Sequence, residues 1–252
     1  MLGSALVYSA VVVACAGLVS AIWKVPLPGL TTRSHGLMVA GAGLSVALGG
    51  LLLPAFESRA TGAGSRLDEF APAWQFHEVH TIRIAAPPER VFDAIKQVRA
   101  DEIVLFRALT WIRRVGRPLP PGILNAGSRE PLLDVAAKGS FVWLADDRPR
   151  EIVVGTVVAA PPGLRRGTLT PGVFKTALPR GFALAAMNFV VTPDGANASI
   201  VSTETRVFAS SPSARRRFAA YWRVIYPGSA IIRRMWLRAI ERRACTRSAR
   251  QA

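Results

Sequence analysis

The sequence predicts an α+β protein: an antiparallel sheet and a long C-terminal helix, preceded by a two-helix transmembrane hairpin. Three observations predict this class. Two long uncharged runs occupy the first 56 residues. Apolar residues then alternate with a period of two between about residues 132 and 209, which is typical of strands. After residue 210 they return to a spacing of three and four, which is typical of a helix.

The N-terminal hairpin is predicted from residues 2–23 and 36–56, which contain no charged side chain. Each run is long enough to cross a bilayer core as a helix. A buried core helix is the alternative for each. A signal peptide fits poorly, because no Lys or Arg precedes the first run and a second run follows at once. Small residues in both runs allow close helix packing; they are Gly3, Gly17, Gly41, Gly43, Gly49 and Gly50.

Residues 57–73, "ESRATGAGSRLDEFAPA", lack periodicity and are interpreted as a linker to a folded domain at 74–245, followed by a tail at 246–252. The domain opens with a strand, "FHEVHTIRI". Pro87 and Pro88 then start a helix through "VFDAIKQV". A second helix is expected across 102–114, with Val104, Leu105, Leu109 and Ile112 inward.

Strands are expected in "LLDVAAKGSFVWLADD", "REIVVGTVVA", "GFALAAMNFVVT" and "ASIVSTETRVFA". The last two flank "PDGAN", a strong hairpin signal, so the strands form an antiparallel meander. Centring the turn on Gly195 sets Met187 opposite Thr203. The more apolar face is taken as the inner one; it carries Met187, Phe189, Val201, Thr203, Thr205 and Val207, and the other carries Asn188, Ser202, Glu204 and Arg206.

The last helix combines an apolar, aromatic stripe with many arginines in "RRRFAAYWRVIYPGSAIIRRMWLRAIERR". Ser211 is positioned to cap it and Pro212 suits its first turn. Pro227 and Gly228 predict a kink or brief break within it.

Two stretches carry a resemblance to a known family. "IRIAAPPERVFDAI", and "VSTETRVFA" followed by "RRRFAAYWRVIYPGSAIIRRMWLRAI", resemble the START-like, or SRPBCC, superfamily of helix-grip domains, which includes polyketide cyclases and lipid-transfer domains. The ending is similar to an uncharacterised, membrane-anchored bacterial subgroup. The resemblance covers about 74–245. It implies a curved sheet around the last helix, with an apolar cavity that typically holds a lipid, sterol or polyketide.

Candidate residues follow from the inner face and the stripe. The expected ligand-binding residues are Trp143, Met187, Phe189, Thr203, Phe218, Trp222 and Ile225. Ordinary core packing is the alternative for each. The opposite face of the last helix is expected to meet anionic lipid, with solvation as the alternative; its residues are Arg215, Arg216, Arg223, Arg234, Arg238 and Arg242.

The sequence indicates no catalytic constellation. His77 and His80 fall on opposite faces of a strand, which disfavours a shared metal, and neither a metal nor another cofactor is expected. Cys15 and Cys245 suggest no disulfide. An enzyme of the cyclase or hydrolase kind and a structural membrane adaptor remain alternatives.

Charge bears on location. The net charge is +16, and setting aside Lys24 and Arg33 leaves +14 for residues 57–252. Such a charge suits the anionic cytoplasmic leaflet, so a multi-pass protein of the bacterial inner membrane with a cytoplasmic domain is expected. Nucleic acid is disfavoured as a partner, since no recognition motif accompanies the charge. The expected function is a membrane-anchored binding protein for a hydrophobic small molecule or lipid.

Overall fold

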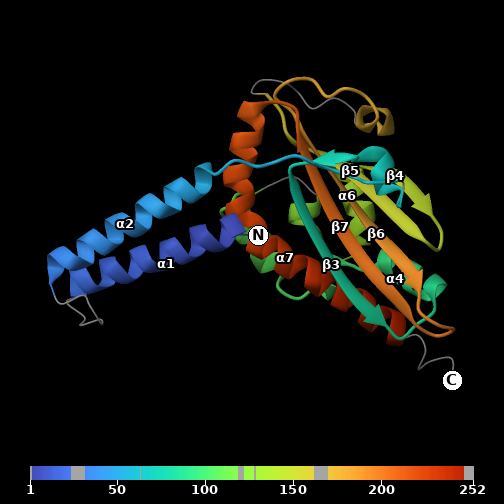
Figure 1. Ribbon diagram of the computed structural model, residues 1–252. Helices are drawn as coiled ribbons and strands as arrows, with labels where there is room; N and C mark the ends of the chain where they lie inside the picture. The colour runs from blue at the N-terminus through green and yellow to red at the C-terminus, as the bar shows by residue number, and fades with distance from the viewer. Residues whose placement is uncertain are drawn as a thin grey trace. The chain divides into compact units, whose positions relative to one another are not determined.

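The computed structural model describes residues 2–23, 32–62, 64–118, 122–127, 129–161 and 170–246 (Figure 1). The chain forms two compact units. The first comprises Met1–Ala55 and Arg216–Pro227, and the second comprises Phe56–Arg215 and Gly228–Ala252. The long helix α7 (Pro212–Thr246) therefore contributes to both. Residues 24–31, between the two predicted spans, and most of the predicted tail lie outside the described residues.

The first unit is built on the helices α1 (Leu2–Trp23) and α2 (Arg33–Leu52), which are long and apolar enough to cross a membrane. The second helix begins earlier than expected, because the Thr32 side chain accepts a hydrogen bond from the backbone N–H of His35 at 3.2 Å and caps it. It ends at Leu52, ahead of Pro54, because the residue before a proline disfavours helical geometry.

Small residues bring α1 and α2 into close contact. A Cβ added at Gly17 would lie 2.6 Å from the backbone nitrogen of Ala40, and one at Gly43 would lie 2.7 Å from that of Ala14. A Cβ added at Gly41 would have no atom within 4 Å, so Gly41 faces away from α1. Gly17 and Gly43, but not Gly41, thus permit the close packing that the sequence suggested.

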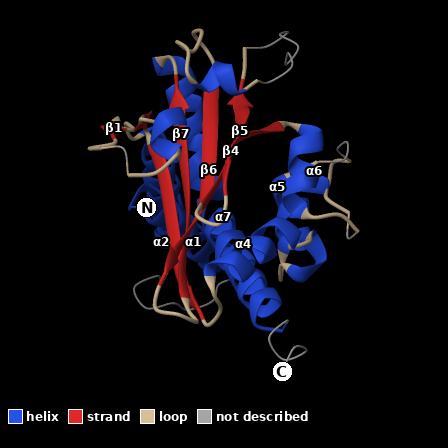
Figure 2. Ribbon diagram, turned by 90° about the vertical axis from the view of Figure 1, so that its right-hand side faces the viewer, coloured by secondary structure: helices blue, strands red, loops and turns tan. Residues whose placement is uncertain are grey.

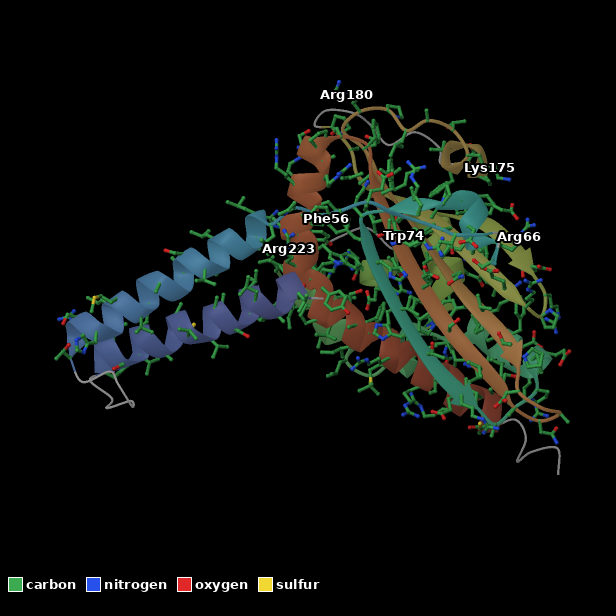
Figure 3. The ribbon with its side chains drawn as sticks, viewed as in Figure 1. Phe56, Arg66, Trp74, Lys175, Arg180 and Arg223 are labelled. Carbon is green, nitrogen blue, oxygen red and sulfur yellow. The ribbon has the colours of Figure 1, made fainter. Side chains whose placement is uncertain are left out.

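In the same unit, Arg223 of α7 is buried and reaches the end of α2 (Figure 3). Its Nη1 donates to the carbonyl of Leu51 at 2.7 Å and its Nη2 to that of Leu53 at 2.6 Å. Tyr8 of α1 donates its hydroxyl to the carbonyl of Val224 at 2.6 Å. A cation at the last carbonyls of a helix satisfies orphan acceptors and complements the helix dipole.

The second unit confirms the expected α+β class. Five antiparallel strands form one sheet in the order β3-β7-β6-β5-β4, so the last four make the predicted meander. The strands are β3 (Phe76–Ile84), β4 (Phe141–Asp147), β5 (Glu151–Ala159), β6 (Ala183–Pro193) and β7 (Ser199–Ala209). The helices are α3 (Leu67–Phe70), α4 (Pro88–Gln97), α5 (Phe106–Arg113), α6 (Leu132–Gly139), η1 (Ala100–Glu102), η2 (Ile123–Asn125) and η3 (Pro171–Phe174).

One face of the sheet, called the inner face below, packs on helices. Met187, Phe189 and Val201 share a buried core with residues of α4 and α6 and with Trp236 and Ile240 of α7. Figure 2 shows the sheet and the neighbouring helices α4, α5 and α6. The apolar alternation of the final hairpin therefore identified the inner face correctly.

The opposite, outer face is covered by the segment that the sequence suggested as a linker. A two-stranded pair joins β1 (Ser58–Arg59) to β2 (Ala73–Trp74), and α3 lies between them in the chain. Leu67 and Phe70 are buried with Val153 and Ala186 of the sheet. Residues 57–73 thus carry structure of their own, because two apolar side chains one helical turn apart find a partner face.

Two further expectations were wrong in detail. Residues 132–139 form α6 and not a strand, because Leu132, Leu133 and Ala136 occupy one buried helical face. Met187 lies opposite Thr205, since a five-residue loop separates Pro193 from Ser199 and shifts the register by two. A shift by two leaves the faces unchanged.

α7 contains no break. It is helical from Pro212 to Thr246 with Pro227 inside it, and the boundary between the two units falls between Pro227 and Gly228. Its start is as predicted, because Ser211 Oγ accepts a hydrogen bond from the backbone N–H of Ala214 at 3.3 Å.

Candidate functional site

The strand register sets two rows of side chains across the inner face. One row runs through Glu78, Thr205, Met187, Val154 and Trp143, from β3 to β4. The next row begins with His80, Thr203, Phe189 and Ile152. Both rows are polar at the β3 edge and become apolar toward the middle of the sheet.

A stripe of α7 faces these rows within the same unit. Ser229, Arg233 and Trp236 follow one another at intervals of four and three residues, so they lie on one side of the helix. The rings of Trp236 and Phe189 meet edge to face at 5.1 Å between centroids. The stripe is therefore polar where the rows are polar and aromatic where the rows are apolar.

Glu78 is the centre of a polar group, which we call the inner-face polar cluster: the buried Glu78 and His80 with the partly buried Ser229 and Arg233. Its Oε1 lies 2.7 Å from His80 Nε2, and its Oε2 accepts a hydrogen bond from Ser229 Oγ at 2.9 Å. Glu78 and His80 are both buried. Buried carboxylates persist when they are paired and hydrogen-bonded, as this one is.

Arg233 supplies the positive charge of the cluster. Burial lowers the pKa of its guanidinium to about 10, while Glu78 raises it and the nearby Arg113 of α5 lowers it. It therefore stays protonated at neutral pH. Among the described residues its hydrogen bond goes to the thioether sulfur of Met187, and its guanidinium lies 5.6 Å from the Trp236 ring. A thioether is a weak acceptor, so the N–H donors of Arg233 can serve an oxygen ligand.

The predicted ligand-binding residues divide between the two units. Trp143, Met187, Phe189 and Thr203 lie in the two rows of the inner face, where Met187, Phe189 and Thr203 are buried and Trp143 is partly buried. Phe218, Trp222 and Ile225 belong to the first unit. There Phe218 stacks on Trp222 at 5.9 Å between ring centroids.

The predicted membrane-facing arginines are mostly exposed. Arg216, Arg234, Arg238 and Arg242 are exposed and Arg215 is partly buried. Arg223 is the exception: it is buried in its contacts with the end of α2 and offers no charge to a surface.

Sequence reasoning missed Glu78 and His80, although a signal was present. Phe76, Ile82 and Ile84 mark the inward positions of β3, so the period of two places Glu78 and His80 on the inner face as well. His77 lies on the other face, as expected, 2.8 Å from Glu204.

A second polar network, on the outer face, has a structural role. Arg206 donates to Asp68 at 2.6 Å and to Glu204 at 2.5 Å, and its guanidinium lies 4.1 Å from the ring of Trp74, labelled in Figure 3. Burial raises the pKa of Asp68, but the hydrogen bond and charge of Arg206 and two backbone N–H groups outweigh it, and the pKa falls below its usual value. The pKa of Glu204 is lowered in the same way: burial raises it, and His77 and Arg206 lower it.

The same network holds the start of α3. Glu151 Oε2 accepts the backbone N–H of Arg66 at 2.8 Å and its Oε1 that of Leu67 at 3.2 Å. Asn188 donates to Glu151 at 2.8 Å. Every charge here has a partner of opposite charge or a matched hydrogen bond, so the network fastens the outer layer to the sheet.

No family model matches the chain, and no curated protein matches it. Among solved structures, it is similar to protein MLL2253 from Mesorhizobium loti, with 16% identity over 67% of this chain and 96% of that one and a TM-score of 0.31. CalU16 from Micromonospora echinospora has 15% identity, with 77% and 95% covered and a TM-score of 0.27. The Zhui aromatase/cyclase from Streptomyces sp. R1128 has 14% identity, with 67% and 94% covered and a TM-score of 0.26. At these values the neighbours carry no argument about function.

Proposed function

We propose that this protein is a membrane-anchored binding protein for a hydrophobic small molecule or lipid, bound between the inner face of the sheet and the second half of α7. The observation that carries the proposal is the gradient across the two rows, from Glu78 and His80 at one edge to Met187 and Phe189 in the middle. A molecule with an apolar body and one polar end matches such a gradient, because each end meets groups of its own kind.

Native mass spectrometry and lipid extraction of the detergent-purified, full-length protein test the proposal. A hydrophobic molecule should copurify. Arg233→Met should weaken its binding about ten- to a hundredfold, since a hydrogen bond to a charged group is worth roughly 1.5–3 kcal/mol. Arg238→Met, an exposed arginine of the same helix, is the matched control and should bind normally. The proposal would be refuted if the wild-type protein bound none of a broad panel of lipophiles.

The anchor and its orientation are also part of the proposal. α1 and α2 have the length and hydropathy of spans, with mean hydropathies of 2.3 and 1.6 in their most apolar windows. With both ends of the chain in the bacterial cytoplasm, the basic residues of the domain meet anionic lipid. Alkaline phosphatase fused after Ala252 should be inactive; an active fusion would place the domain on the other side.

A second candidate is an enzyme of the cyclase or hydrolase kind, favoured by the buried pair of His80 and Glu78, 2.7 Å apart on the same face. A histidine held by a carboxylate is a common general base. If turnover of the copurifying molecule is observed, His80→Gln should lower kcat with little change in its binding. Unchanged kcat would exclude His80 as the base.

A further inference from the structure

α5 and its flanks expose an unusual amount of apolar surface, which we call the α5 apolar strip: Val104, Leu105, Trp111, Ile112 and Val115. Their exposed fractions run from 52% to 82%. The opposite side of this segment is buried, through Ile103, Phe106 and Thr110. Sequence reasoning expected Val104, Leu105 and Ile112 inward; they point outward because the domain uses the other side of the helix.

A surface helix of a soluble domain normally turns a polar face outward. This segment carries large apolar side chains on its exposed side as well as on its buried side, and exposed apolar patches of this kind mark surfaces that bind proteins or membranes. The two non-glycine residues with positive φ in the described chain bracket the helix: Leu105 at 61° and Val115 at 53°. Bulky residues seldom adopt this conformation, and such positions persist at functional sites.

Positive charge surrounds the strip. Residues 103–118 contain Arg107, Arg113, Arg114 and Arg117 and no acidic residue. The carbonyl of Glu102, just before the strip, accepts a hydrogen bond at 2.6 Å from Arg242, which lies on the basic face of α7. Arg242 of the basic face and the start of the apolar strip therefore adjoin within one unit.

We infer that the α5 apolar strip docks into the interface of an anionic bilayer, with its apolar side chains at the acyl boundary and its arginines at the headgroups. Apolar residues with tryptophan, flanked by cations, are the composition of helices that lie in a membrane interface. The inference rests on the proposed anchor: α2 ends at Leu52 and the second unit begins at Phe56, so the tether holds this domain at high local concentration near the bilayer.

Fluorescence quenching in nanodiscs tests the docking on the full-length protein. Discs of phosphatidylglycerol with brominated acyl chains quench tryptophans that reach the acyl region. The contribution of Trp111 is the difference between the wild type and Trp111→Phe, with Trp74→Phe as the control for losing one indole. The fluorescence that this difference assigns to Trp111 should fall by about half or more in the brominated discs, since an interfacial helix lies about 5–10 Å deep in the acyl boundary.

Two variants make the test specific. Ile112→Glu should abolish the bromine quenching of Trp111, and Ile200→Glu, which charges an exposed isoleucine of β7, should leave it unchanged. Quenching should weaken in zwitterionic discs; equal quenching there would refute the role of the arginines. If Trp111 is quenched by aqueous iodide and not by bromine, or by neither because another protein surface or a second copy covers it, the docking is wrong. Ligand copurification is measured separately, so a failure here leaves the binding proposal to its own test.

Discussion

Removing the Glu78 carboxylate should destabilise the second unit strongly. Glu78→Ala takes away the acceptor of Ser229 and the partner of His80, at 2.9 and 2.7 Å, and the charge that faces Arg233. Each buried group left without its partner costs about 1–3 kcal/mol. Two such groups, His80 and Ser229, lose their partner here, so we expect a loss of about 2–6 kcal/mol in the free energy of unfolding.

Two comparisons separate the charge from the hydrogen bonds. Glu78→Gln keeps the shape and an acceptor and exchanges charged hydrogen bonds for neutral ones, so a loss of about 2 kcal/mol is expected. Glu130→Ala removes a carboxylate from an exposed pair with Lys138 and should cost no more than about 1 kcal/mol.

Denaturant unfolding of the full-length protein in micelles, followed by strand ellipticity, measures these differences. The free energy of unfolding falls linearly with denaturant concentration, so extrapolation to zero denaturant gives its value for each variant, provided that the slope of this line is the same in all of them. If Glu78→Ala cost no more than Glu130→Ala, Glu78 would not be the buried centre of a coupled cluster, and the site described above would be wrong.

Three further outcomes follow from other contacts. Gly43→Leu should disrupt the pairing of α1 with α2, seen as faster proteolysis of the hairpin in micelles, and Gly41→Leu should not, because only the first added side chain meets backbone. The pKa of Asp68 is lowered in the folded protein, so its contribution to the free energy of unfolding is full above the unfolded-state pKa near 4 and is lost as pH falls through the folded-state pKa. Arg206→Met should therefore reduce the loss of stability at acid pH in a pH series of unfolding curves. Arg223→Met should speed hydrogen exchange of the amides in the last turn of α2, and unchanged exchange would contradict its capping role.

Much of the fold was readable from periodicity. The alternation in "FHEVHTIRI" predicted β3 with its observed bounds, and the hairpin signal placed the last two strands. What failed depends on tertiary partners. Residues 132–139 suit a strand and a helix alike over so short a run, and only burial of Leu132 and Leu133 decides for the helix. The loop after Pro193 sets the register through its length, which residue types alone do not specify.

The site was harder to predict, because its residues look ordinary one at a time. Glu78 and His80 are polar residues in a strand with an exposed side, and a single sequence gives no partner for either. Their meaning depends on Ser229 and Arg233, about 150 residues later, meeting the same row of the sheet. The alternation of β3 was sufficient to assign their face, but not to bring α7 opposite them.

The two polar groups differ in how the charge of their arginine is compensated. In the outer network Arg206 has two carboxylates, a carbonyl and an aromatic ring, so its burial is offset within the fold. In the inner-face polar cluster, Arg233 donates, among the described residues, to the sulfur of Met187. The neighbouring Trp236 belongs to the apolar core. Replacing Arg233 alone with an apolar residue would leave the buried Glu78 carboxylate without the positive charge that faces it, which is a destabilising change. The two arginines therefore differ in their acceptors: Arg206 has strong ones, whereas the acceptor of Arg233 is a thioether, which is weak.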